Sequence, residues 1–91
     1  MGHGIMIGPN VGIITANHDL MNPNAGHQSG RDVVIGKNCW IGMNAIILPG
    51  VVLGDHTIVG AGSVVTHSFP EGWAVIAGNP AKKIRDLTKP S

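Results

Sequence analysis

Aliphatic residues recur at a fixed spacing of six along most of this chain. From Ile35 onward they occupy Ile35, Ile41, Ile47, Leu53, Val59 and Val65. The same register opens the chain at Met1, Ile7 and Ile13, with Ile5 and Val11 at a second inward position. A period of six fits neither the 3.6-residue period of an amphipathic helix nor the alternation of an ordinary strand. A fixed period of this kind predicts a repeat architecture.

Smaller residues keep the same register. Glycine follows the aliphatic position at Gly36, Gly42, Gly54 and Gly60, and the position four residues after it holds Cys39, Ala45, Val51, Thr57, Ser63 and Phe69. Each hexad therefore predicts a short strand and a corner, with the aliphatic side chain inward and glycine relieving a corner of positive φ. Three hexads would close one triangular turn, and successive turns would stack in parallel about 4.8 Å apart.

One interruption breaks the repeat. Ile13 and Ile35 are 22 residues apart, which is two hexads plus ten residues, and the intervening Asn22-Pro23-Asn24-Ala25-Gly26 is rich in turn residues. We therefore expect an all-β, parallel β-helix of about three to four triangular coils over residues 1–91, with a protruding loop at about 19–28. A β-sandwich is disfavoured, because its turns are spaced about 8–12 residues apart without a fixed hexad.

Composition indicates the size of the domain, its compartment and the classes of partner that it excludes. Ninety-one residues suffice for one small domain, and a net charge of +1 with 12% charged residues gives no nucleic-acid footprint. The single cysteine, Cys39, cannot form an internal disulfide, which fits a reducing compartment. We expect no signal peptide, and no apolar run approaches the roughly 20 residues of a membrane span. We expect a cytoplasmic protein that binds neither nucleic acid nor membrane.

Three stretches resemble the hexapeptide-repeat acetyltransferases, especially galactoside and maltose O-acetyltransferases and related sugar- or antibiotic-modifying enzymes. They are IGPNVGIITANHD, VVIGKNCWIGMNAIILPGVVLGDHTIVGAGSVV and IAGNPAKKIR, and together they cover nearly the whole chain. The resemblance implies a left-handed coil, a homotrimer and acetyl-CoA as co-substrate, with no metal. It also implies that residues of about 78–88 form a turn leading into a short basic helix.

His18 is the candidate general base. Acetyl transfer from a thioester needs a base for the acceptor proton, donors for the oxyanion and a groove for the pantetheine arm. A neutral histidine can act as such a base at pH 7, and the resemblance implies this role where the coil leaves for the loop. Asn17 and Asp19 beside it are candidate acceptor-binding residues. The alternative is that His18 is an ordinary solvated loop histidine.

Trp40 is the first candidate for cofactor binding. An outward tryptophan on a coil is usually an interface or ligand residue, and the resemblance implies that Trp40 lines an acyl-CoA channel between two subunits. Simple packing within a trimer is the alternative. Met43 stands where the galactoside enzymes have a serine near the thioester, so any oxyanion donor here would be a backbone N–H.

Further cofactor contacts are implied at the end of the repeat. Ala61 and Gly62 match a Gly-Ala-Gly-Ser corner whose backbone meets the pantetheine amides, and small residues suit such close approach. Lys82 and Arg85 could pair with the phosphates of the coenzyme, the alternative being a solvated basic face. The full candidate set is Trp40, Gly42, Met43, Ala61, Gly62, Thr66, Lys82 and Arg85.

The other histidines and the cysteine are weaker candidates for catalysis or metal binding. No two histidines are five residues apart, as they are among the zinc ligands of the trimeric γ-class carbonic anhydrases, so zinc chemistry is not expected. Cys39 falls at an inward position and is interpreted as a core residue rather than a nucleophile.

The predicted function is acetyl transfer from acetyl-CoA to a hydroxyl or amine of a small acceptor, with a sugar favoured. The alternative is a non-catalytic, coenzyme A-binding β-helical trimer. This alternative rests on Met1, which opens in mid-repeat, so the sequence predicts that the N-terminal region of the resembling enzymes is absent. An open first coil would then either fray or meet its copy in a head-to-head dimer of trimers.

Overall fold

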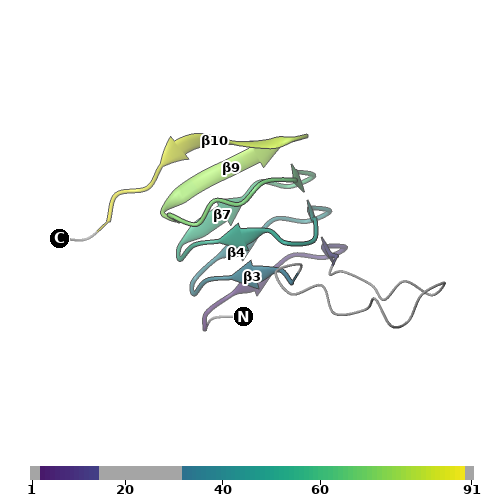
Figure 1. The fold of residues 1–91 in the computed structure, drawn as a ribbon, viewed down its shortest axis with the longest axis horizontal. Helices are drawn as coiled ribbons and strands as arrows, with labels where there is room; N and C mark the ends of the chain where they lie inside the picture. Colours follow the sequence, from purple (N-terminus) through teal and green to yellow (C-terminus); the bar gives the residue numbers. More distant parts are fainter. Residues whose placement is uncertain (1–2, 15–31, 90–91) are drawn as a thin grey trace.

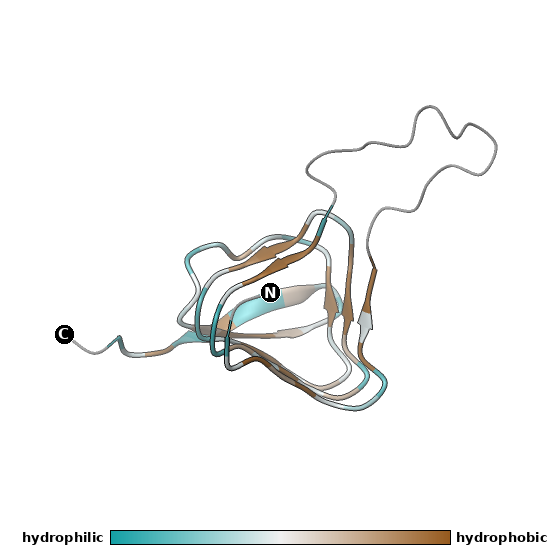
Figure 2. Cartoon of the chain, turned by 90° about the horizontal axis from the view of Figure 1, so that it is seen from below, coloured by the Kyte–Doolittle hydropathy of each residue, from teal (hydrophilic) through white to brown (hydrophobic). Residues whose placement is uncertain are grey.

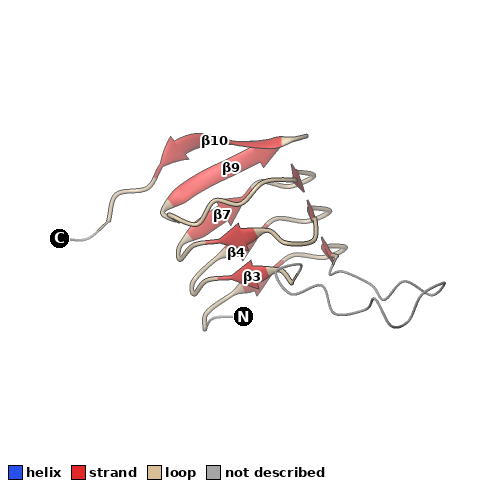
Figure 3. Cartoon of the chain, in the orientation of Figure 1, coloured by secondary structure: helices blue, strands red, loops and turns tan. Residues whose placement is uncertain are grey.

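The chain forms a parallel β-helix in a computed structural model that describes residues 3–14 and 32–89 (Figure 1). Short strands joined by tight corners make up its coils (Figure 3). Over the described residues the strands are β1 (Met6–Ile7), β2 (Gly12–Ile13), β3 (Val34–Ile35), β4 (Trp40–Ile41), β5 (Ile46–Ile47), β6 (Val52–Leu53), β7 (Thr57–Val59), β8 (Val64–Val65), β9 (Ala74–Gly78) and β10 (Ala81–Asp86).

The strands stack into the three faces of a triangular prism (Figure 2). One face has the order β1-β4-β7-β9-β10, the second β2-β5-β8 and the third β3-β6. Pairing between coils is parallel, and its register places Met6 beside Trp40 and Trp40 beside Ile58. Trp40 and Ile58 are 18 residues apart, which is three hexads, so three hexads make one turn as the sequence predicts.

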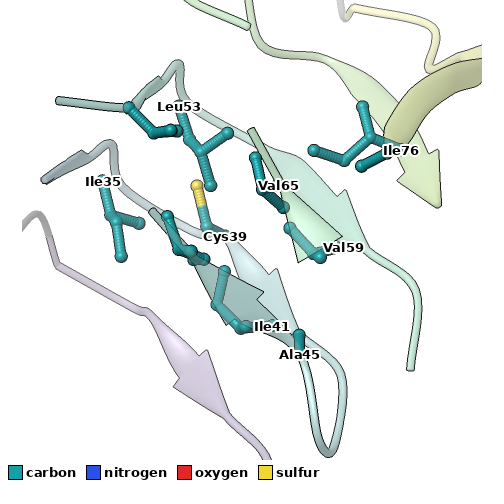
Figure 4. Close-up of a cluster of buried hydrophobic side chains, with 11 residues drawn as sticks. Ile35, Cys39, Ile41, Ala45, Leu53, Val59, Val65 and Ile76 are labelled. Atoms are coloured by element: carbon teal, nitrogen blue, oxygen red, sulfur yellow. The ribbon is translucent and has the colours of Figure 1, made fainter. Parts of the chain in front are cut away.

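The core lies inside the prism and follows the period of six. From Ile35 onward the aliphatic residues of the first inward position are 2% exposed or less, namely Ile35, Ile41, Ile47, Leu53, Val59 and Val65. The second inward position is equally buried at Cys39, Ala45, Val51, Thr57 and Ser63. Side chains of both sets meet along the axis of the coil (Figure 4). The predicted core is therefore confirmed from Ile35 to Val65, whereas Ile7, which shares the register in the first coil, is 44% exposed.

The glycines after the aliphatic positions do not serve the purpose predicted for them. Positive φ occurs instead at Asn10, Asn38, Asn44, His56 and Trp73, and at Gly4, Gly50, Gly62, Gly72 and Gly78. A Cβ at Gly42 would lie 2.7 Å from the backbone N of Ala61 and 2.9 Å from the carbonyl oxygen of Val59. Gly42 is thus required by the closeness of the next coil, and the prediction of positive φ there is wrong.

The predicted C-terminal helix is also wrong. Residues Ala81–Asp86 form β10, which pairs antiparallel with β9 and caps the stack (Figure 1). Ala81 is 2% exposed and joins the core, so strand pairing and burial outweigh the helix propensity of the Ala-Lys-Lys-Ile-Arg sequence. The expected loop at 19–28 lies outside the described residues. Within those residues the structure contains no helix long and apolar enough to cross a membrane.

Candidate functional site

A hollow of about 450 Å³ lies over β1, β4 and β7, on the outside of the first face. Its volume is in the range of small-ligand sites. Its lining carries no ionisable side chain and consists of Gly8, Pro9, Trp40, Gly42, Met43, Ile58, Val59, Gly60 and Ala61. We call this hollow the groove, and residues 8–10, 42–44 and 60–62, which turn the chain from the first face to the second, the groove corner.

Strand register builds the groove from three coils. Successive side chains of a strand point to opposite faces, so Ile41 enters the core while Trp40 points outward. Parallel pairing places Ile58 beside Trp40 on the same outer surface. Trp40 is 54% exposed and Met43 50% exposed. The result is a contiguous apolar surface that the described part of the chain leaves uncovered, a feature of ligand or subunit contacts.

The backbone of the groove corner ends in an open acceptor. The N–H of Asn44 donates to the carbonyl of Pro9 at 3.0 Å, and the N–H of Gly62 donates to the carbonyl of Met43 at 2.8 Å. One coil further on, no backbone N–H among the described residues donates to the carbonyl of Ala61. The chain leaves the coil there through the turn between β9 and β10. A carbonyl in this position can accept a hydrogen bond from a ligand amide.

Several residues predicted from the sequence come together here. Trp40, Gly42, Met43 and Ala61 all line the groove. Gly62 follows directly at φ 72°, and no atom lies within 4 Å of a Cβ built on it.

The remaining predicted residues lie elsewhere. The Thr66 hydroxyl lies 2.7 Å from Nδ1 of His67 and does not line the groove. Asn17, His18 and Asp19 lie outside the described residues, so their predicted roles stay predictions.

One of the two predicted phosphate ligands, Lys82, lines a second hollow of about 350 Å³, together with His67, Phe69, Pro80, Ala81 and Lys83. It shares no lining residue with the groove. Lys83 pairs with Asp86 at 2.9 Å, and this hydrogen bond raises the pKa of the Lys83 ammonium. Arg85 lies opposite Val75 in the β9–β10 pairing and lines neither hollow. Lys82 is therefore better placed than Arg85 to meet an anion in this hollow.

Sequence reasoning missed part of the lining. Pro9 and Ile58 also line the groove. Pro9 lies one coil before Met43 at the equivalent position, and Ile58 lies one coil after Trp40. The 18-residue step would have identified Ile58, whereas Pro9 required the placement of the first coil beneath the second. Cys39 lies outside the groove and in the core, where burial raises the pKa of its thiol and its Sγ lies 3.2 Å from the carbonyl oxygen of Gly54.

The repeat is that of a known family of proteins. Residues 32–67 match the family described as bacterial transferase hexapeptide (six repeats). The chain belongs to this hexapeptide-repeat family, and its matched relatives carry acetyltransferase names.

Relatives with assigned names extend the likeness beyond the repeat. Galactoside O-acetyltransferase of Escherichia coli is 36% identical over 89 residues, covering 96% of this chain and 43% of the relative. Among solved structures, a maltose O-acetyltransferase from Clostridium difficile 630 is 44% identical with a TM-score of 0.77, covering 93% of this chain and 46% of that one. A galactoside acetyltransferase in complex with coenzyme A is 34% identical with a TM-score of 0.76, covering 94% and 44%. The chain thus spans less than half the length of these relatives.

Proposed function

We propose that this chain binds acetyl-CoA in the groove and transfers the acetyl group to a hydroxyl or amine of a small acceptor, with a sugar as the favoured class. The observation that carries the proposal is the convergence of Trp40, Gly42, Met43 and Ala61 on one apolar groove beside an open backbone carbonyl. The solved galactoside acetyltransferase that holds coenzyme A supports this ligand. The names of the galactoside and maltose relatives support a sugar acceptor.

The groove suits the pantetheine arm of the coenzyme. That arm is a narrow, largely apolar chain with two amide groups. The Trp40 ring and the Met43 side chain offer apolar contact, and the carbonyl of Ala61 can accept an amide N–H. Lys82 in the second hollow would meet the phosphates, with charge pairing screened over about 8–10 Å in ordinary buffer. Arg85 and Thr66 would then have at most peripheral roles.

His18 is the proposed general base. Its imidazole would take the proton of the acceptor hydroxyl or amine as the acceptor attacks the thioester carbonyl carbon. Collapse of the tetrahedral intermediate breaks the carbon–sulfur bond, and the imidazolium returns the proton to the departing thiolate. Because Met43 has no hydroxyl, the oxyanion would be held by a backbone N–H. Asn17 and Asp19 would orient the acceptor.

A homotrimer is part of the proposal. Met6 is 61% exposed and Trp40 54% exposed, so the outer first face offers apolar surface to a second copy. Three copies around one axis would bury these faces and wall each groove with a neighbour. Sedimentation should show a trimer at micromolar concentration, and a stable monomer would contradict this part. The left-handed winding, the pairing of two trimers and the cytoplasmic location stay predictions.

The test of ligand binding is a calorimetric titration of the chain with coenzyme A. We expect one site per chain and a melting temperature that rises with ligand concentration, because a ligand that binds only the folded state stabilises it. Pantetheine, which lacks the nucleotide, should still bind because the groove takes the arm. Absence of binding by both ligands would overturn the proposal.

The test of catalysis replaces His18 and uses His27, a second histidine of the same region, as the matched control. His18→Ala should slow release of free coenzyme A thiol in the presence of a galactoside by about 10²–10⁴-fold, the usual contribution of a general base. His27→Ala should leave this rate within about twofold. Binding of coenzyme A without transfer to any galactoside, maltoside or amino-sugar acceptor would favour the non-catalytic coenzyme A-binding trimer instead.

A further inference from the structure

Ser63 is one of two buried polar side chains among the described residues, the other being Thr57. Both occupy the second inward position of their hexads. Each hydroxyl donates to the carbonyl of the glycine three residues earlier at 2.7 Å, Thr57 to Gly54 and Ser63 to Gly60. The two residues thus make the same local hydrogen bond at successive corners. On this observation alone, both would be structural residues of the coil.

The Ser63 hydroxyl takes part in one further hydrogen bond. Its Oγ also accepts the N–H of Gly78 at 3.2 Å. Gly78 is the last residue of β9 and begins the turn to β10 at φ 105°. The hydroxyl therefore joins the final coil to the turn by which the chain leaves the repeat, across 15 positions of sequence.

This hydrogen bond lies where the coil-to-coil backbone hydrogen bonds of the groove corner end. In the coil before, the N–H of Gly62 ties the groove corner to the carbonyl of Met43. The carbonyl of Ala61 has no such backbone donor among the described residues. The Ser63 hydroxyl bridges Gly60 and Gly78 around this gap. Gly60 lines the groove, so the Ser63 hydroxyl contacts the backbone of one residue of its wall.

We infer that Ser63 is a positioning residue for the groove: its buried hydroxyl holds residues 60–62 against the start of the β9–β10 turn, and thereby keeps the Ala61 carbonyl open and oriented toward a thioester cofactor. The inference rests on the proposed binding of acetyl-CoA and adds to it a residue that contacts no ligand. A residue with a purely structural role would contribute to folding stability and leave the Kd for coenzyme A unchanged.

The chain offers a matched control. Ser63→Ala and Thr57→Val each remove a buried hydroxyl and its 2.7 Å hydrogen bond, while nearly conserving volume. Both should lower the melting temperature, and Ser63→Ala should lower it more because the N–H of Gly78 also loses its partner. Ser63→Ala should raise the Kd for coenzyme A about tenfold, whereas Thr57→Val should stay within about twofold of the wild type. Ser63→Thr keeps the hydroxyl in a position that Thr57 shows can hold threonine, and should restore binding.

Hydrogen exchange separates this inference from the proposed function. The amides of Gly62 and Gly78 should exchange faster in Ser63→Ala than in the wild type and be unchanged in Thr57→Val. If the wild-type chain fails to bind coenzyme A, the proposed function falls, and unchanged exchange at both amides would overturn the Ser63 link as well. If the wild type binds and the two hydroxyl variants weaken binding equally, the positioning role is wrong and the groove stands.

Discussion

Two corners of the same triangular coil end their stacks in opposite ways. At the corner formed by Asn38, His56 and Trp73, which we call the stacked corner, side chains and backbone both continue from coil to coil. The Asn38 Nδ2 lies 3.3 Å from Nε2 of His56, whose ring stacks on Trp73 with centroids 3.9 Å apart. The N–H of Trp73 donates to the carbonyl of Asp55, and the N–H of Leu87 donates to the carbonyl of Trp73. The backbone of this corner is thus hydrogen-bonded from coil to coil as far as Leu87.

The groove corner differs in its last step. Its left-handed positions are Asn10, Asn44 and then Gly62, with φ of 61°, 61° and 72°. Where the stacked corner ends in two rings, the groove corner ends in a glycine with open space at its Cβ position and a carbonyl without a backbone donor among the described residues. One repeat can therefore build both a corner that is closed by stacked rings and an open corner, which we propose as part of the cofactor site. The difference lies in the residue at the left-handed position and in the β9–β10 turn, where the chain leaves the coil.

The largest expected effect concerns the spacing between coils beneath the groove. Gly42→Ala would place a Cβ 2.7 Å from the N of Ala61, a backbone atom that cannot move aside cheaply. We expect a loss of about 2–3 kcal/mol in the free energy of unfolding, as for other overpacked sites. Denaturant titration at constant protein concentration measures it.

Gly12→Ala is the control for spacing, because its new Cβ would meet only Cγ1 of Ile46 at 3.9 Å. That variant should keep wild-type stability within about 0.5 kcal/mol, the usual range for a substitution outside special features. Equal stability of the Gly42 and Gly12 variants would show that close packing of coils does not explain the glycines after the aliphatic positions.

The second prediction tests whether glycine at position 62 is needed for its positive φ or for the open space that it leaves for a ligand. Gly62→Asn installs the residue that the chain itself uses at this corner one coil earlier, Asn44. Asparagine tolerates positive φ, so folding should be nearly unchanged. The added side chain would fill the open space beside Ala61 and raise the Kd for coenzyme A about tenfold, which equals about 1.4 kcal/mol. Unchanged affinity would mean that the cofactor does not use this space.

The smallest effect is expected at the stacked corner. His56→Asn likewise installs the residue used one coil earlier, Asn38, and removes the ring that stacks on Trp73. Loss of one aromatic pair should cost about 1 kcal/mol in stability. Coenzyme A affinity should stay at the wild-type value, since no stacked-corner residue lines the groove. Weaker binding of coenzyme A by this variant would contradict the claim that the groove corner, and not the stacked corner, contributes to cofactor binding.

The contrast also explains what could be predicted from the sequence. The column from Ile35 to Val65 was predictable because each coil repeats the same demand for an inward aliphatic side chain. The end of the repeat was not. Residues 81–86 favour a helix locally, but pairing with β9 made them a strand.

Some candidate site residues could likewise be predicted from the repeat, whereas others depend on the end of the coil. The shared column of Trp40 and the glycine corner at Ala61 could be found from the repeat and the resemblance. The hydrogen bond between Ser63 and Gly78 depends on where Gly78 lies against the last coil, and the six-residue repeat does not predict that position.

The most direct test of the central claim is residue-resolved NMR of the amides during a titration with coenzyme A. The account predicts that the amides of Gly42, Ala61 and Gly62 and the indole N–H of Trp40 shift with one common dissociation constant. The amides of Asn38, His56 and Trp73 should keep their positions. Shifts confined to the stacked corner, or none anywhere at saturating coenzyme A, would contradict the assignment of the groove as the cofactor site.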